Sequence, residues 1–447
     1  MAGRWIERWE PEDEDFWRAG GERTARRNLA FSVLCEHIGF SVWTLWSVLV
    51  LFMGPEYGVD AAGKFFLIAT ATLVGALVRV PYTFAVARFG GRDWTVFSAL
   101  LLLLPTAAAW LVMEPGTPYS TFLLVAALTG IGGGNFASSM TNINAFFPQR
   151  HKGWALGLNA GGGNIGVPVV QLAGLLVIGI AGAAHPRLLL GAYLPLIVLA
   201  ALCAALFMDN LAPVRNDTGA VRRAVREPHT WILAFLYVGT FGSFIGYGFA
   251  FGLVLQSGFG RTPLQAASLT FLGPLLGSLA RPVGGRLADR LGGARVTLWA
   301  FAAMAAATGV VVYASIQRSL PVFLAGFTAL FVLSGLGNGS TYKMIPAVFR
   351  AEAGRRGLAG EAADALGRRL SGAAMGLIGA VGALGGLGIN LAFRQSFRGA
   401  GTGTAAFVAF LVFYGACLAV TWTVYLRRPA GSAEGAGTGP RPAYAEV

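Results

Sequence analysis

Charged residues and cysteines are scarce in this sequence. Only 12% of its 447 residues are charged, about half of the roughly 25% that is typical of soluble domains. The three cysteines, Cys35, Cys203 and Cys417, all fall within apolar stretches, so we expect neither a disulfide nor a metal site. No catalytic triad, metal-ligand cluster or phosphate-binding loop is visible. These shortages argue against a soluble protein and against an enzyme, and we expect no cofactor.

Long apolar stretches are abundant instead. Hydrophobic residues make up 55% of the chain, and the mean hydropathy is +0.62. A helix needs about 20 apolar residues to cross a hydrocarbon core of about 30 Å, and stretches this long without alternating polarity are not strands of a membrane barrel. We therefore predict an all-α membrane protein with twelve transmembrane helices. They are expected at 29–53, 65–87, 95–113, 120–147, 153–181, 188–208, 229–257, 264–288, 295–316, 320–348, 370–393 and 403–426.

The basic residues are distributed unevenly among the predicted loops. Of the 34 Lys and Arg residues, 25 fall in the N-terminal head, the even-numbered loops and the tail, six in the odd-numbered loops and three inside spans. This bias places both termini in the cytoplasm by the positive-inside rule. The net charge of +13 is then a signal of topology in the cell membrane, and we expect the lipid bilayer rather than nucleic acid as the partner.

Two halves of six spans repeat one pattern. In spans two and eight a glycine lies four residues before an arginine and another follows 11 residues after it, with an offset of 202 between the halves. Spans four and ten repeat with an offset of 203, and spans five and eleven, more loosely, with 219. The paired positions are Gly75, Arg79, Gly90 and Asn135 in the first half and Gly277, Arg281, Gly292 and Asn338 in the second.

This parallel duplication, with "GGRLADRLGGAR" after span eight, resembles the major facilitator superfamily. The resemblance implies two pseudo-symmetric six-helix bundles that bind substrate near the bilayer midplane and expose it alternately by rocking, and a cytoplasmic gate motif. The motif residues are Gly285, Asp289 and Arg290. The expected domains are a cytoplasmic head (1–28), bundles at 29–208 and 229–426, a cytoplasmic linker (209–228) and a disordered cytoplasmic tail (427–447).

Four ionisable residues lie clearly inside predicted spans. They are Arg79, Arg281, Lys343 and Glu36, and charges in hydrocarbon by default mark a site or pathway. The repeat-equivalent Arg79 and Arg281 are expected to face each other across the central cavity, where two planar guanidinium forks suit a small oxyanion. The alternative is a structural role, with each arginine neutralised by a helix C-terminus or by Glu36. Lys343 is expected to extend to the cytoplasmic interface.

Span five combines glycines with amide side chains. Gly157, Gly161 and Gly162 give it a face on which a neighbouring helix or a ligand can approach the backbone closely. Asn159 and Asn164 supply amide donors beside that face. Close helix packing with bridging asparagines is the alternative interpretation. We accept it in part for the glycines and favour ligand binding for Asn164.

Several motifs together resemble one family. The stretches "GGGNFASSMTNINAFFP", "KGWALGLNAGGGNIGV", "GAAMGLIGAVGALGG", "RVPYTFAVARFGGR" and "LARPVGGRLADRLGG" are similar to the nitrate/nitrite porter family of the major facilitator superfamily. The resemblance extends from Asn28 to Arg428. It implies that Arg79 and Arg281 clamp the anion, and that Asn164 contributes an amide.

The resemblance also implies that Phe136, Tyr237 and Phe241 wall the site. Tyr237 and Phe241 are four residues apart and share one helix face, although ordinary aromatic packing would produce the same spacing. Glycines of spans five and eleven are assigned to packing and conformational change. They are Gly157, Gly161, Gly162, Gly376 and Gly382.

The predicted function is secondary active transport of nitrate and nitrite by rocker-switch alternating access, by a protein that works as a monomer. A carrier of another small anion, such as a short carboxylate, is the second hypothesis, and a non-transporting membrane sensor is the third. A sensor should carry a signalling domain, and the cytoplasmic segments are too short for one.

Two modes of coupling are possible for the transport of nitrate, namely exchange for nitrite and symport with protons. Two uncompensated positive charges resist occlusion of an empty site, which favours nitrate/nitrite exchange. Proton symport is the alternative, and Glu36 and His37 are the titratable pair that would serve it. A structural role for this pair is equally open. We also expect an interfacial head containing Trp5, Trp9 and Trp17, and a surface helix in the loop 350–369.

Overall fold

The computed structural model describes residues 5–212, 214 and 218–427. The described residues are almost all helical, and their only strands are β1 (Trp5–Ile6) and β2 (Asn210–Leu211), which pair in parallel. The predicted all-α class is confirmed. The disordered tail expected at 427–447 lies, apart from Arg427, outside the described residues.

The first six predicted spans are all helical, although three of them are interrupted. The breaks fall at Leu102, at the 3-10 segment Gly130–Gly134 and at Ile165. Four of the five residues of Gly130–Gly134 are glycine, which gains little from α-helical geometry. The helices are α1 (Glu14–Phe16) in the head, followed by α2 (Glu22–Phe52), α3 (Ala61–Phe89), α4 (Gly91–Leu101), α5 (Leu103–Val112), α6 (Tyr119–Thr129), α7 (Asn135–Phe146), α8 (Gln149–Asn164), α9 (Gly166–Ala181) and α10 (Pro186–Phe207).

The second six predicted spans are also helical. Their helices are α12 (Pro228–Tyr237), α13 (Ser243–Phe259), α14 (Pro263–Thr270), α15 (Leu272–Leu291), α16 (Gly293–Ile316), α17 (Leu320–Arg355), α18 (Gly360–Ala400) and α19 (Thr404–Thr421). A π-helical turn, Val238–Gly242, joins α12 to α13. The linker contains a basic helix that the sequence did not reveal, α11 (Thr218–Arg226). The surface helix expected at 350–369 is not separate, because these residues end α17 and begin α18.

Eleven helical segments of the described chain are long and apolar enough to cross a membrane. The predicted eighth span corresponds to α14 and α15, which are not among the eleven. α14 has eight residues, and α15 carries Arg281, Arg286, Asp289 and Arg290. The molecule is therefore a multi-pass membrane protein, and its helices are consistent with twelve spans.

Contacts divide the chain into two units that differ from the two sequence halves. Unit 1 comprises Met1–Asn216, Gly246–Leu275 and Gly386–Gly403, and unit 2 comprises Asp217–Ile245, Leu276–Gly385 and Thr404–Val447. Two segments of the second half thus pack with the first half, while the predicted bundles 29–208 and 229–426 remain a prediction from the repeat.

Specific contacts hold these two segments inside unit 1. Gln171 Nε2 donates to the Gly248 carbonyl of α13 at 2.7 Å. Near the end of α18, Phe393 stacks on Phe65 of α3 at 5.3 Å between ring centroids, and the guanidinium of Arg394 lies 4.0 Å from the Phe66 ring centroid. The starts of α3 and α9, most of α13 and the end of α18 are therefore parts of one packed body.

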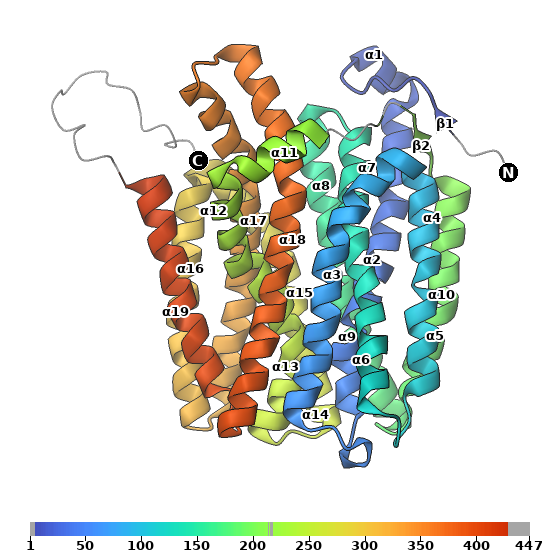
Figure 1. Ribbon diagram of the computed structural model, residues 1–447, viewed down its shortest axis with the longest axis vertical. Helices are drawn as coiled ribbons and strands as arrows, with labels where there is room; N and C mark the ends of the chain where they lie inside the picture. Colours follow the sequence, from blue (N-terminus) through green and yellow to red (C-terminus); the bar gives the residue numbers. More distant parts are fainter. Residues whose placement is uncertain (1–4, 213, 215–217, 428–447) are drawn as a thin grey trace. The chain divides into compact units, whose positions relative to one another are not determined.

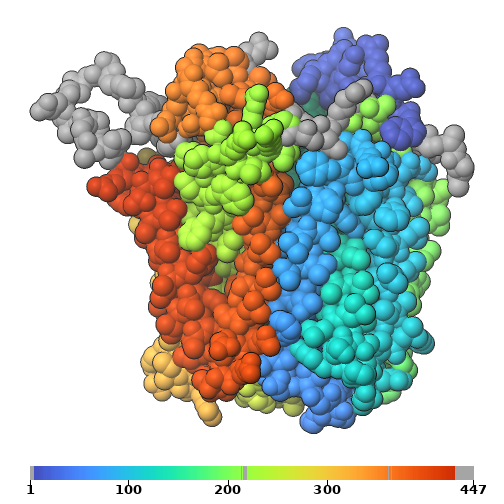
Figure 2. Space-filling model, viewed as in Figure 1, coloured from blue at the N-terminus to red at the C-terminus, as the bar shows by residue number. Residues whose placement is uncertain are grey.

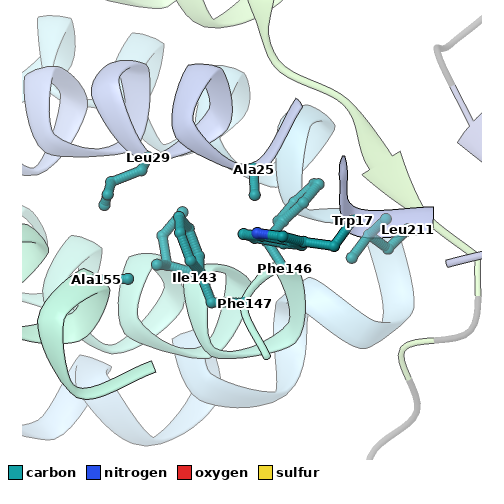
Figure 3. Close-up of a cluster of buried hydrophobic side chains, with 8 residues drawn as sticks. All are labelled: Trp17, Ala25, Leu29, Ile143, Phe146, Phe147, Ala155 and Leu211. Carbon is teal, nitrogen blue, oxygen red and sulfur yellow. The ribbon is translucent and has the colours of Figure 1, made fainter. Parts of the chain in front are cut away.

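The head packs against unit 1, and its expected place at a membrane interface remains a prediction. Figure 1 shows α1, β1 and β2 together at one end of the unit 1 helices, and Figure 2 shows the head there in dark blue. Trp17 is buried, whereas Trp5 remains about half exposed. Figure 3 shows the side chains that gather between α2, α7 and α8. This buried cluster consists of Trp17, Ala25, Leu29, Ile143, Phe146, Phe147, Ala155 and Leu211.

Polar contacts tie the head to the start of the linker. The buried Asp209 carboxylate accepts from Arg27 at 2.5 Å and from Asn28 Nδ2 at 2.8 Å. Asn210 Oδ1 accepts from the backbone N–H groups of Arg92 and Asp93, which begin α4. Head, linker and α4 are therefore joined at one end of unit 1.

Glycine contacts inside each unit agree with the predicted repeat. A Cβ on Gly163 would meet the Glu36 side chain in unit 1, and a Cβ on Gly382 would meet the Tyr237 ring in unit 2. Gly75 packs on Gly133 and Gly277 on Gly335, one residue out of step with the offset of 203. Gly90 and Gly292 both have left-handed φ angles, of 86° and 90°. The repeated glycines therefore make similar helix contacts in both units.

Candidate functional site

Arg79 lies inside unit 1 between two aromatic rings. It is 1% exposed, and its guanidinium carbon is 4.6 Å from the Phe136 ring centroid and 5.2 Å from that of Trp43. Cation–π attraction is strongest where both groups are desolvated. The structure therefore brings Phe136 to Arg79, as expected, and adds Trp43.

Glycines on α3 and on the 3-10 segment make room for the Trp43 indole. A Cβ on Gly75 would meet Trp43 Nε1 and Cε2, and a Cβ on Gly133 would meet Trp43 Cδ2. Gly75 is the glycine that precedes Arg79 by one helical turn, so it shares the face of α3 that presents the guanidinium. The repeated glycine–arginine spacing thus has a packing reason in unit 1.

Glu36 is the centre of a buried polar cluster of unit 1. Its carboxylate accepts hydrogen bonds from the Ser139 hydroxyl and from Asn159 Nδ2, the latter at 2.6 Å. Asn159 Nδ2 also donates to Ser139 Oγ at 2.9 Å. Asn159 therefore bridges α8 to α2 and α7, which is the alternative interpretation stated for the asparagines of span five.

His37 points to a different neighbour. Its Nδ1 lies 3.3 Å from the Gly162 carbonyl oxygen of α8, so His37 and Glu36 contact α8 at different residues. The structure assigns both side chains a place in helix packing. A role in proton transfer remains a prediction.

Asn164 differs from Asn159 in having no hydrogen-bond partner. It is completely buried, and neither its Oδ1 nor its Nδ2 bonds to any described residue. A buried amide without a partner costs about 1–3 kcal/mol. The asymmetry between the two asparagines is what a ligand-binding amide at Asn164 requires.

The predicted glycines of spans five and eleven behave in two ways. Gly162 packs on Val33 and Gly382 on Tyr237. A Cβ on Gly157 or Gly161 would meet no described atom within 4 Å. Gly376 is partly exposed. Close packing therefore explains some of the glycines, while Gly157 and Gly161 leave a bare backbone face.

In unit 2, Arg281 lies beside tyrosines. Its Nη2 donates to the Tyr237 hydroxyl at 3.5 Å, and its guanidinium carbon is 5.7 Å from the Tyr342 ring centroid. Its Nη1 is buried without a hydrogen-bond acceptor among the described residues. Tyr237 and Phe241 stack at 5.2 Å with 14° between their planes. The structure thus brings the predicted Tyr237 to the Arg281 guanidinium, places the predicted Phe241 behind Tyr237, and adds Tyr342.

The predicted gate motif lies on the exposed end of α15. Asp289 accepts a hydrogen bond from Lys343 Nζ at 2.7 Å, with both side chains about half exposed, so the lysine forms an ion pair at the surface. Of the two neighbouring glycines, Gly284 is the one that packs closely, because a Cβ there would clash with the Leu336 backbone. A Cβ on Gly285 would face open space. Arg290 is exposed.

Three contact residues were missed from the sequence. Trp43 follows Glu36 by seven residues, a spacing that puts both on one helix face. Ser139 follows Phe136 by three residues on α7, and Tyr342 is its counterpart at the offset that relates Asn135 to Asn338. The repeat could therefore have identified Tyr342, since Ser139 contacts Glu36 and Tyr342 contacts Tyr237.

Each unit therefore presents one buried guanidinium packed against aromatic rings. A guanidinium remains protonated in proteins and donates in a plane, so each site can bind an oxyanion. The described residues contain no group of three or more His, Cys, Asp or Glu that could hold a metal ion. The arrangement is suited to binding rather than to covalent chemistry.

Comparison with known families gives one match across most of the chain. The model of the Major Facilitator Superfamily matches residues 29–387.

Curated relatives of high similarity are named as transporters. The nitrate/nitrite transporter NarU of Salmonella typhimurium is 39% identical, over 94% of this chain and 96% of its own. NarU of Escherichia coli is 38% identical with the same coverage. A protein of Thermus thermophilus named as a probable nitrate/nitrite antiporter, NarK2, is 36% identical over 78% of this chain and 83% of its own.

Solved structures share the fold at low sequence identity. The xylose transporter XylE of E. coli, in a partially occluded inward-open conformation, has a TM-score of 0.65 at 12% identity, with 90% of this chain and 98% of that chain covered. The human organic anion transporter MFSD10 has a TM-score of 0.61 at 16% identity, covering 89% and 99%. At these identities the likeness concerns the fold alone.

Proposed function

The chain belongs to the nitrate/nitrite porter family of the major facilitator superfamily, and we propose that it carries nitrate and nitrite across the cytoplasmic membrane by rocker-switch alternating access. The observation that carries the proposal is a buried arginine at the same repeat position of each unit, set against aromatic rings. The names of its relatives support the choice of anion.

Arg79 and Arg281 are the proposed anion-binding residues, and Asn164 is the proposed amide donor. Arg281 Nη1 and Asn164 Nδ2 are buried donors without an acceptor in the described chain, and an anion would supply the acceptor that these two donors lack. Phe136, Tyr237 and Phe241 complete the proposed site. Their rings suit the flat faces of nitrate and nitrite, which form hydrogen bonds only at their edges.

A short carboxylate is the rival substrate. It too would pair with arginine and accept from an amide donor such as Asn164, but its alkyl group is not planar and does not match the flat ring faces. Competition distinguishes the two. Nitrite should displace labelled nitrate, and excess acetate or propionate should not.

Nitrate/nitrite exchange is the proposed mode of coupling. Two buried guanidinium groups favour an occupied site during reorientation, because an anion offsets positive charge that water no longer screens. Proton-coupled nitrate symport is the second candidate. The buried carboxylate of Glu36, hydrogen-bonded to Ser139 and Asn159, is the observation in its favour.

The proposed orientation has both termini and the linker in the cytoplasm, with the protein working as a monomer in the bilayer. The distribution of Lys and Arg supports this orientation. The exposed arginines of α11, namely Arg222, Arg223 and Arg226, add to the positive charge of that side.

The proposed function is tested by uptake of labelled nitrate into proteoliposomes. Vesicles are prepared with and without internal nitrite, and with and without an inward proton gradient. Uptake that requires internal nitrite supports exchange. Absence of nitrate uptake under all four conditions, by protein correctly folded in the vesicles, overturns the proposal and leaves a carrier of another anion or a sensor.

A further inference from the structure

Trp43 is held more rigidly than its contact with Arg79 requires. The side chain is fully buried, and its indole N–H donates to the Ala71 carbonyl of α3 at 3.0 Å. Ala71 lies two helical turns before Arg79, on the same face of α3. The indole therefore donates to the helix that carries the arginine, and its ring centroid lies 5.2 Å from the guanidinium carbon.

The surroundings of Trp43 restrict the ring in other directions. Gly75 and Gly133 leave no room for a Cβ beside it. Phe40 and Phe249 pack against it edge-on at 5.5 and 5.3 Å. A ring held in this way offers one fixed plane, and Phe136 lies 4.6 Å from the same guanidinium.

The repeat shows that this anchor is special to unit 1. Gly277 precedes Arg281 as Gly75 precedes Arg79, and the ring that fills the space at Gly277 belongs to Phe244. Phenylalanine has no N–H group with which to bond to a carbonyl. Unit 1 therefore has an indole where unit 2 has a phenyl ring. The indole lies next to a guanidinium that can bind an anion only if its N–H donors point at the anion's oxygens.

We propose that Trp43 is a positioning residue for anion binding. It fixes the plane of the Arg79 guanidinium by stacking, and its hydrogen bond to Ala71 fixes the indole itself. Arginine has many rotamers, and holding one of them before the anion arrives removes an entropic cost of binding. This inference rests on the proposed role of Arg79 in binding nitrate.

Trp43→Phe is the decisive variant, because it keeps an aromatic ring and removes the N–H group. Trp46→Phe is the matched control, since Trp46 is also buried on α2 but its Nε1 has no hydrogen-bond partner among the described residues. Nitrate/nitrite exchange in proteoliposomes gives KM and the maximal rate for each variant. The apparent unfolding temperature of the purified protein is measured in parallel.

The expected result for Trp43→Phe is a rise of about tenfold in the KM for nitrate, with the maximal rate and unfolding temperature close to those of the wild type. Trp46→Phe should keep the wild-type KM. Gly75→Ala displaces the indole but leaves Trp43 itself in place. If this variant folds, its KM should rise as it does in Trp43→Phe.

Two results would overturn the inference. The first is an unchanged KM in Trp43→Phe together with a raised KM in Arg79→Lys. That result would refute the positioning role of Trp43 and leave the proposed function intact. The other is a loss of maximal rate and of unfolding temperature at constant KM, which would make Trp43 a packing residue only. A wild-type KM in Arg79→Lys would instead refute the proposed role of Arg79, and the positioning role with it.

Discussion

The hydroxyl of Tyr237 lies 3.5 Å from Nη2 of Arg281. This is a long hydrogen bond, in which the phenol oxygen accepts from the guanidinium. The same Tyr237 ring stacks on Phe241 and packs against Gly382, so its position is fixed. A phenol held in this way can hold the guanidinium in place and donate to a bound anion.

Replacing Tyr237 by phenylalanine should therefore weaken nitrate binding while the stack on Phe241 is kept. Loss of one hydrogen bond to a charged group predicts a KM raised by about tenfold. The exchange assay measures it, and Tyr313→Phe is the control because Tyr313 is exposed. An unchanged KM in Tyr237→Phe would limit Tyr237 to packing.

Replacing Arg79 or Arg281 by lysine should reduce transport severely. Lysine keeps the charge and loses the planar fork of donors, and it stacks less well on Phe136 or Tyr342. Exchange is measured at equal amounts of protein in the membrane, which controls for insertion. Transport at the wild-type level in both lysine variants would mean that charge alone is needed.

Cysteine accessibility tests the proposed orientation. In a background without the three native cysteines, Arg222→Cys on α11 should resist impermeant thiol reagents in intact cells. Glu114→Cys, in the exposed turn after α5, should react. Both should react once the membrane is permeabilised. The reverse pattern in intact cells would invert the proposed topology.

The Glu36 cluster decides between the two modes of coupling. Glutamine at this position retains an oxygen that can accept from Ser139 and Asn159, so under exchange Glu36→Gln should still trade nitrate for internal nitrite. Vesicles without internal anion, with an inward proton gradient and the potential clamped near zero, should accumulate almost no nitrate. Strong proton-driven accumulation that Glu36→Gln abolishes would establish symport and make Glu36 the proton carrier.

Asp209 should contribute to stability through the head. Asp209→Ala removes a buried acceptor from Arg27 and Asn28, and we expect a loss of about 1–3 kcal/mol, seen as a lower unfolding temperature in detergent. The control is Glu114→Ala, which breaks an exposed pair with Arg187 and should cost less than about 1 kcal/mol. Equal effects of the two substitutions would show that the head adds no stability.

The sequence predicted the spans and the repeat because both depend on local composition. A run of apolar residues needs a helix wherever it lies in a bilayer, and Gly163 and Gly382 recur because each must let a neighbouring helix approach. The arginines were found because charge is rare in such runs. The structure places one predicted aromatic residue beside each arginine, Phe136 beside Arg79 and Tyr237 beside Arg281, and the site itself remains a prediction.

The remaining features depend on contacts between distant parts of the chain. Trp17 looked like an interfacial residue until the structure placed it against Phe146 and Leu211. Asn159 and Asn164 look alike in the sequence. Only the packing of α8 on α2 decides that Asn159 bonds to Glu36, whereas Asn164 bonds to none of the described residues. No periodicity encodes such choices, because they depend on which face of each helix meets which neighbour.

The pairing of β1 with β2 has a consequence for the order of biosynthesis. Trp5 and Ile6 precede their partners Asn210 and Leu211 by almost half of the sequence. β1 therefore cannot pair until the six predicted spans between the two strands have been synthesised and α10 has left the ribosome. Trp9, whose indole N–H donates to the Phe146 carbonyl at the end of α7, can dock earlier, so the head becomes ordered in two stages.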